Sequence, residues 1–153
     1  MLSKNKILKN ILICVLLVLV VLQFFKPTKN TSEEILNSDI LKAEKLPRDI
    51  SRILVRSCYD CHSNTTKYPW YSEITPVNYF LANHVNDGKK HLNFSEWAKL
   101  SSERKTHKVK EIGEEIENEK MPLNSYIWLH NDARITEEQK QLLLEWVKNY
   151  QPN

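Results

Sequence analysis

The sequence Cys58-Tyr59-Asp60-Cys61-His62 places two thiols three positions apart and a histidine directly after the second thiol. This C-x-x-C-H spacing is the pattern of c-type haem attachment. Two thiols one helical turn apart can form thioethers with the two vinyl groups of a single porphyrin. The imidazole that follows can bind the iron as the proximal axial ligand. The motif therefore predicts one covalently attached haem c, held by Cys58 and Cys61 and ligated by His62.

Three other interpretations of the two cysteines remain open. A C-x-x-C pair also occurs in thioredoxin-like redox proteins, but these require a βαβ setting that the sequence does not show. The pair can form half of a zinc site, although no second cysteine pair and no H-x₃₋₅-H pair follow. A chance match is the third, since short motifs always carry that risk. A structural zinc or disulfide module would contain no covalent haem.

An unbroken apolar run of twelve residues, Ile11–Leu22, lies close to the N-terminus. With its flanks it covers residues 7–25, and a helix of that length rises ~28 Å, close to the thickness of one hydrocarbon core. A cleaved signal peptide would need small residues near its end, but the first alanine is Ala43 and the first glycine is Gly88. We therefore expect an uncleaved transmembrane anchor, with a removed signal peptide and a buried core helix as alternatives.

The lysines around this run predict its orientation. Three lysines precede it and two follow it, so the short N-terminus is expected to stay inside the cell. The predicted organisation is a cytoplasmic N-terminus at 1–6, a transmembrane anchor at 7–25, a tether at 26–45 and a haem c-binding domain at 46–153. That domain would lie in the periplasm of a bacterium, attached to the inner membrane, in a compartment where disulfides also persist.

The charge of the chain argues against one class of partner. The formal net charge is +3, with 22 Lys and Arg against 19 Asp and Glu. Five of the lysines precede residue 30, in a stretch without acidic residues, so the rest of the chain is nearly neutral. A nearly neutral domain offers no basic face to a nucleic acid, and we expect no such partner.

The periodicity of the remaining sequence predicts helices and no strands. Apolar residues recur at helical spacing before the cysteine motif and near the C-terminus, and no alternating segment of useful length is present. Capping boxes at Thr31–Glu34 and Thr136–Gln139 mark two expected helix starts. Ser95 is expected to cap a short helix, and Gly88 is expected to end the helix before it. The expected helices cover residues 31–45, 49–57 leading into the motif, 76–88, 92–97, 102–119 and a last segment from 136. The predicted fold class is all-α.

Five short motifs follow one another between residues 46 and 149. They are Ser57-Cys-Tyr-Asp-Cys-His-Ser63, Tyr68-Pro-Trp-Tyr71, Leu92-Asn-Phe-Ser-Glu-Trp97, Met121-Pro122 and the helix that begins at Thr136. In this order they resemble a family of small haem-binding, cytochrome c-like proteins, which are exported and often membrane-anchored in bacteria. The resemblance implies a cytochrome c-like helical domain with a single haem attached through Cys58 and Cys61 and ligated by His62. Asn131 stands where a proline is expected after Leu129-His130, which weakens the case for a role of His130.

The motif does not provide the second axial ligand of the iron. Met121 is the favoured residue, because it is the only methionine besides the initiator and the proline after it fixes the backbone. Core filling is the competing interpretation of a lone methionine. His84, on an apolar helix face, is the alternative ligand, and His130 is the third candidate. His91 and His107 stand among lysines and are expected to be solvated.

The loop after the motif carries the densest aromatic cluster of the chain. We expect Trp70 and Tyr71 to pack on the haem, where an indole N–H or a phenol could also reach a propionate. Filling of the protein core is the alternative role. The rest of the ring is expected to be buried by Phe80, Trp97 and the helix that carries Trp146.

A haem ligated by histidine and methionine has no open coordination site and a raised reduction potential. These properties suit one-electron transfer. The sequence therefore predicts a membrane-anchored electron carrier, rather than an enzyme, whose partners are redox proteins of unknown identity. The alternative is a haem-based sensor or a peroxidase-like enzyme, in which the distal ligand leaves and a small molecule binds. Such a protein could recruit His84.

Overall fold

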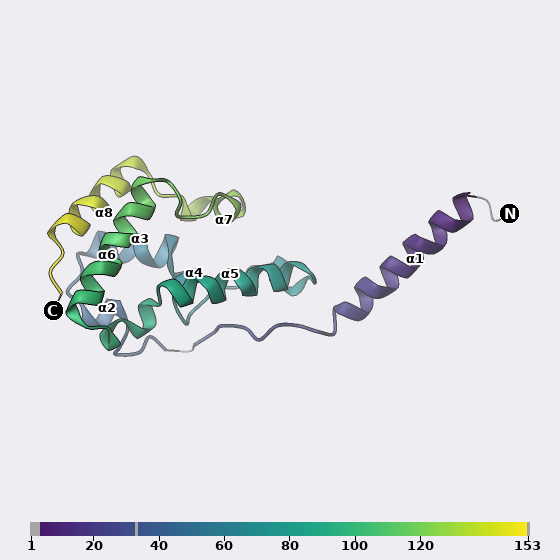
Figure 1. Cartoon of the computed structure of the whole chain (residues 1–153), viewed down its shortest axis with the longest axis horizontal. Helices are drawn as coiled ribbons and strands as arrows, with labels where there is room; N and C mark the ends of the chain where they lie inside the picture. The colour runs from purple at the N-terminus through teal and green to yellow at the C-terminus, as the bar shows by residue number, and fades with distance from the viewer. Residues whose placement is uncertain (1–3, 33, 153) are drawn as a thin grey trace. The chain divides into compact units, whose positions relative to one another are not determined.

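The computed structural model describes residues 4–32 and 34–152. The regular secondary structure within them consists of helices and one isolated antiparallel bridge between Thr31 and Thr65 (Figure 1). The predicted all-α class is confirmed. The elements are α1 (Lys4–Leu22), α2 (Ile40–Ala43), α3 (Arg48–Ser57), α4 (Tyr59–His62), η1 (Trp70–Glu73), α5 (Val77–His91), η2 (Phe94–Lys99), α6 (Ser102–Glu117), α7 (Asn124–Leu129), η3 (Asn131–Ala133) and α8 (Glu137–Asn149).

The chain divides into two compact units. Unit 1 combines the N-terminal part up to Lys29 with Tyr68–His84, and unit 2 combines Asn30–Lys67 with the chain from Val85 onward. The cysteine motif lies in unit 2, and α1 lies in unit 1. Helix α5 contributes residues to both units.

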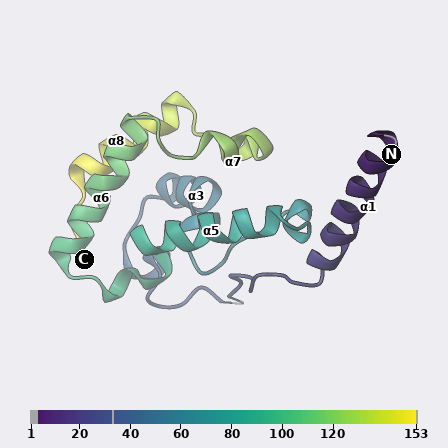
Figure 2. The same ribbon diagram turned by 45° about the vertical axis from the view of Figure 1, so that its right-hand side comes forward.

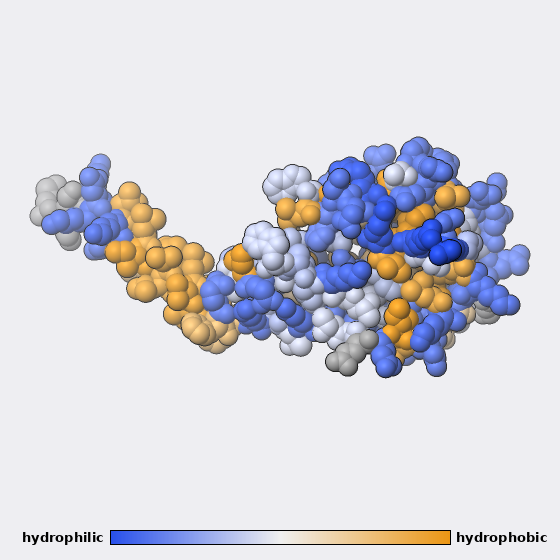
Figure 3. Space-filling view, turned by 180° about the vertical axis from the view of Figure 1, so that it is seen from behind, coloured by the Kyte–Doolittle hydropathy of each residue, from blue (hydrophilic) through white to orange (hydrophobic). Residues whose placement is uncertain are grey.

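In unit 1, α1 is an apolar helix with no protein packed around it. Its mean hydropathy reaches 2.3 over 18 residues, and none of that stretch is buried. Figure 3 shows it as a largely hydrophobic rod with hydrophilic residues at its N-terminal end. Helix α1 is therefore long and apolar enough to be a membrane span or a signal sequence.

The residues that follow α1 are bonded to a segment about fifty positions later in the chain. The side-chain amide of Gln23 donates to the Thr75 carbonyl at 3.1 Å and accepts from the Thr75 N–H at 3.0 Å. The Tyr79 hydroxyl donates to the Phe25 carbonyl at 3.3 Å. Lys26 pairs with Glu73 at 2.7 Å, and Lys29 pairs with the other oxygen of the same carboxylate. The end of α1 and residues 73–79 thus form one folded piece.

In unit 2, α6 and α8 lie side by side in both ribbon views (Figures 1 and 2). Helix α3 contacts α8, and α4 contacts α3. Gly113 of α6 allows the close approach, because a Cβ there would lie 2.8 Å from a methyl carbon of Val147 in α8. The buried core of the unit comprises Ile40, Ile50, Ile53, Leu54, Tyr59, Phe94, Trp97, Val109, Ile112, Ile116 and Leu143.

Part of the segment expected to be a tether supplies core residues of unit 2. Ile40 is completely buried, and the buried Asp39 carboxylate caps α2 by accepting from the Leu41 N–H at 3.0 Å. Glu44, with a side chain only 2% exposed, pairs with Lys105 at 2.9 Å and also accepts the Trp97 indole N–H at 3.0 Å. These bonds join α2 to α6 and η2 across more than fifty residues of sequence.

Several predicted boundaries are wrong. No helix begins at Thr31; α2 starts at Ile40, and Glu33 of the expected capping box lies outside the described residues. Helix α5 continues through Gly88 to His91. Asn93, rather than Ser95, caps η2.

Other boundaries agree with the sequence. Helix α3 leads into the motif, and the capping box of Thr136 with Gln139 is present at the start of α8. Helix α6 stops at Glu117, two residues early, because Glu119 reverses the chain with φ of 56°. Of the two expected capping boxes, only the one at Thr136, which is followed by a long apolar stripe, marks a helix start.

The pair of Glu44 and Lys105 gives a first prediction. Lys105→Met removes one partner of a buried ion pair, so an uncompensated carboxylate remains and the free energy of unfolding should fall by about 3–5 kcal/mol. Lys110→Met, which breaks the exposed pair of Lys110 with Glu114, is the matched control and should change it by less than about 0.5 kcal/mol. Urea titrations of both full-length variants measure this, and equal losses would contradict the structural role of Lys105.

Candidate functional site

The cysteine motif forms a single helical turn at the end of α3. Cys58 breaks the helix, with φ of −125° and ψ of −34°, although its N–H still donates to the Leu54 carbonyl at 3.0 Å. The His62 N–H then donates to the Cys58 carbonyl at 3.0 Å and closes the turn. Cys58 and Cys61 are both free thiols and are both half-buried. The turn therefore carries the two thiols and the imidazole on one short rigid element.

Tyr59, inside the motif, fastens this turn to the core. Its hydroxyl donates to the buried Asp39 carboxylate at 2.5 Å, and its ring stacks on Phe94 with centroids 5.3 Å apart. The other oxygen of Asp39 accepts from the Ser95 hydroxyl at 3.1 Å. Burial, together with the bond to Asp39, raises the pKa of Tyr59, so the phenol remains a hydrogen-bond donor.

Asp60, the second residue between the cysteines, makes bonds to two other segments. One oxygen accepts from the Tyr126 hydroxyl of α7 at 2.6 Å, and the other accepts from the Lys67 N–H at 3.0 Å. Burial and the bond to Asp60 raise the pKa of Tyr126 and keep its hydroxyl protonated. The turn is thus attached on one side to α2 and η2, and on the other side to α7.

His62 is held in one orientation by backbone carbonyls. Its Nδ1 lies 3.0 Å from the Gly88 oxygen and 3.1 Å from the Leu92 oxygen. A carbonyl oxygen only accepts, so Nδ1 carries the proton and Nε2 carries the lone pair. Burial lowers the pKa of His62, which favours the neutral imidazole. A neutral histidine whose other nitrogen is fixed by a carbonyl is the form in which histidine binds a metal.

Gly88 is required for this arrangement because α5 approaches the motif with its backbone. A Cβ at Gly88 would lie 2.6 Å from the Cys61 carbonyl oxygen, closer than real Cβ contacts occur. The absence of a side chain therefore brings the Gly88 and Leu92 carbonyls within reach of His62. The sequence suggested only a helix end at this glycine.

The surroundings of the two thiols disfavour their thiolate forms. Burial raises the pKa of Cys58 to about 12 and that of Cys61 to about 11, and each thiol is also near a further group that disfavours the thiolate. Catalytic cysteines of disulfide oxidoreductases have a lowered pKa instead. Among the described residues no three His, Cys, Asp or Glu side chains converge as a metal site. The environment therefore favours the protonated form of both thiols.

The candidates for the second axial ligand lie in different parts of the chain. Met121 is half-buried against the core of unit 2, directly after α6. His84 lies in unit 1, where its Nδ1 donates to the Phe80 carbonyl at 2.9 Å and its ring lies 4.2 Å from the Phe80 ring. His130 stacks on Tyr126 with centroids 4.4 Å apart. The identity of the second ligand remains a prediction.

The other histidines and the tryptophans that the sequence analysis considered differ in their exposure to solvent. His91 and His107 are exposed, as expected, and His107 lies 3.2 Å from Glu111. Trp70 is 78% exposed and contacts the Tyr71 ring edge-on in unit 1. Trp97 is completely buried and donates to Glu44, so the expectation that it covers a haem is wrong and it is a core residue.

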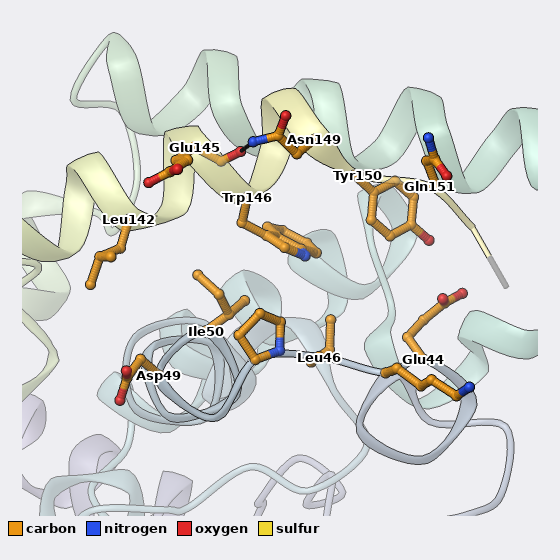
Figure 4. Close-up of a pocket in the computed structure, with 12 residues that line it drawn as sticks. Glu44, Leu46, Asp49, Ile50, Leu142, Glu145, Trp146, Asn149, Tyr150 and Gln151 are labelled. Carbon is orange, nitrogen blue, oxygen red and sulfur yellow. Dashed lines mark hydrogen bonds between the residues drawn. The ribbon is translucent and has the colours of Figure 1, made fainter.

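A pocket of about 480 Å³ opens between α8 and the chain that enters α3 (Figure 4). Trp146 of α8 and Tyr150, which directly follows α8, project into it opposite Leu46 and Ile50. Its lining contains no His, Cys or Met. The pocket therefore contains none of the iron ligands that the sequence predicts, and Trp146 lines this pocket.

Some residues of the site could not be recognised in the sequence. Asp39 and Tyr126 support the motif from 20 and 66 positions away. Neither belongs to a local pattern that would pair it with the cysteines. The sequence shows Gly88, but the role of this glycine depends on the approach of α5 to the Cys61 carbonyl, which is a contact between distant segments.

The glycine contact gives a second prediction. Gly88→Ala should lower the free energy of unfolding by about 1–3 kcal/mol, because the added methyl group meets a backbone oxygen that cannot rotate away. Asn86→Ala, at an exposed position of the same helix, is the control and should leave the free energy of unfolding unchanged or slightly raised. Denaturant unfolding of both variants tests this, and a Gly88→Ala protein as stable as the wild type, or more stable, would refute the close approach.

Comparison with known proteins identifies the family of the chain. No curated protein and no solved structure shows significant similarity to the chain. The family model of a haem-binding domain matches residues 17–149 of the chain. This range includes the cysteine motif and the helices α5 to α8. The chain thus belongs to the haem-binding domain family.

Proposed function

We propose that the protein is a mono-haem c-type cytochrome that carries electrons at a bacterial membrane. The orientation of His62 is the observation that supports this most strongly. Its Nδ1 proton is bound to two carbonyls, so the neutral Nε2 is left as a metal ligand on the same turn as two protonated thiols. These are the donors that a covalently attached haem requires, in the order that the motif predicts.

Each residue of the turn would have a separate role. Cys58 and Cys61 would hold the porphyrin through two thioethers, and His62 would bind the iron as proximal ligand. The bonds of Tyr59 to Asp39 and of Asp60 to Tyr126 would keep the turn from moving when the iron changes charge. A bound haem supplies an iron centre that gains or loses one electron.

Met121 is the second axial ligand in this proposal. It is half-buried on the apolar core of the same unit as the motif, in the turn where Glu119 reverses the chain after α6. Thioether ligation favours the reduced iron and leaves no open coordination site, which suits electron transfer to redox proteins. The proposal keeps Trp70 and Tyr71 as residues that contact the haem, as the sequence predicts.

We propose that α1 is retained as the anchor. Gln23, Lys26 and Lys29 make bonds with Glu73 and Thr75, and these bonds support retention of the segment that follows α1. Removal of α1 together with Gln23 would leave both backbone groups of Thr75 without these partners. Lys4, Lys6 and Lys9 in the N-terminal half of α1 favour a cytoplasmic N-terminus, with the haem-binding domain in the periplasm.

The attachment has a direct test in the three cysteines of the chain. In a host competent for c-type maturation, Cys58→Ala or Cys61→Ala should leave at most one thioether, and the double variant should lose covalent haem. Cys14→Ala, in the exposed α1 cysteine, is the control and should retain it. Haem staining of a denaturing gel and the pyridine haemochrome yield per chain measure this. Wild-type yield in the double variant would refute covalent attachment.

Substitution of Met121 distinguishes a carrier from a ligand-binding haem protein. Met121→Ala should lower the reduction potential and allow carbon monoxide to bind the reduced iron, because an axial position opens. His84→Ala is the parallel variant and should leave the spectrum and the potential unchanged. The opposite pattern would identify His84 as the ligand. Rapid carbon monoxide binding by the wild-type protein would favour the sensor or peroxidase-like alternative.

A further inference from the structure

Five exposed apolar side chains gather where α1 ends. Two of them follow α1 directly, and three belong to the segment that is bonded to it. They are Phe24, Phe25, Ile74, Val77 and Tyr79, which are 84%, 61%, 43%, 38% and 42% exposed. We refer to these five residues as the collar. All of them belong to unit 1.

The bonds of unit 1 fix the collar at the end of α1. Gln23 bonds both backbone groups of Thr75, which is the neighbour of Ile74 and is itself buried. The Tyr79 hydroxyl reaches the Phe25 carbonyl directly. The paired cations Lys26 and Lys29 hold Glu73 beside them, and they lower the pKa of this exposed carboxyl to about 2. Residues 73–79 therefore cannot move far along the axis of α1 without breaking these bonds.

The length of α1 sets the environment at that position. Nineteen helical residues rise ~28 Å, about the thickness of the hydrocarbon core, so the end of α1 falls at the level of the lipid headgroups. Phenylalanine side chains and the amphipathic ring of tyrosine are suited to this layer, and lysines next to them can reach the phosphates. A water-exposed site would instead leave five apolar side chains without cover.

We propose that the collar lies in the interfacial layer of the phospholipid bilayer and forms a second membrane contact next to α1. This inference rests on the proposed retention of α1 as the anchor. Ile74, Val77 and Tyr79 insert among the glycerol and headgroup atoms, while Phe24 and Phe25 continue the apolar surface of α1. The collar fixes the start of α5 at the membrane surface, so unit 1 is held to the bilayer by two segments.

Photo-crosslinking in lipid nanodiscs tests the proposal on the full-length holoprotein. The nanodiscs contain a phospholipid with a diazirine close to the glycerol backbone; after illumination, digestion and mass spectrometry locate the lipid adducts. The peptide with residues 74–79 should carry at least fivefold more adducts per residue than peptides of α6, whose outer face is charged. The haem absorbance of the same sample reports the cofactor independently.

The peptides of α1 separate the two proposals. Adducts on α1 with fewer than fivefold enrichment at residues 74–79 would overturn the collar and leave the anchor intact. An absence of adducts on α1 as well would overturn both.

A double variant provides the matched control. Ile74→Glu with Val77→Glu places charges in the collar and changes neither Gln23 nor its bonds to the Thr75 backbone. In this variant the number of adducts at residues 74–79 should fall at least fivefold, while the adducts on α1 and the haem absorbance should remain unchanged. Unchanged adducts at residues 74–79 in this variant would show that these side chains do not make the contact, and would overturn the proposal.

Discussion

The hydrogen bonds from His62 Nδ1 to the carbonyls of Gly88 and Leu92 determine what the cysteine motif can do. They fix the tautomer of the imidazole and the direction of Nε2. They exist because Gly88 has no side chain and lets α5 approach the Cys61 carbonyl. A histidine on a flexible turn would need to be ordered when iron binds, whereas this one is ordered by the fold. The conformational entropy of ordering the ligand is therefore lost during folding rather than during iron binding.

The residues between the cysteines have a structural role of their own. Tyr59 and Asp60 each bond to a distant partner, Asp39 and Tyr126, in the same unit. The turn of four residues in α4 is too short to be stable alone, because a helix of that length forms few internal bonds. Its partners in α2, η2 and α7 stabilise it, and the pair of Glu44 with Lys105 holds α2 against α6. The site thus depends on contacts made throughout unit 2.

The sequence allowed the all-α class, the position of α1, the helix before the motif and the capped start of α8 to be predicted. These features depend on local patterns: an apolar run, a helical stripe, or a capping box. The start of α2 and the role of Gly88 could not be predicted, since both depend on contacts between segments far apart in sequence. Thr31 resembled a helix start, yet it pairs with Thr65, and Asn30 bonds the Ser63 carbonyl instead. Tertiary bonds outweighed the local preference there.

The state of His62 in the reduced holoprotein is the most direct measure of this account. Low-spin ferrous iron is diamagnetic, so the ring nitrogens of ¹⁵N-labelled His62 can be observed by nuclear magnetic resonance. We expect Nδ1 to carry a slowly exchanging proton, as its bonds to the Gly88 and Leu92 carbonyls require. We expect Nε2 to be unprotonated and shifted by iron. A proton on Nε2, or a rapidly exchanging proton on Nδ1, would contradict the proposed role of His62.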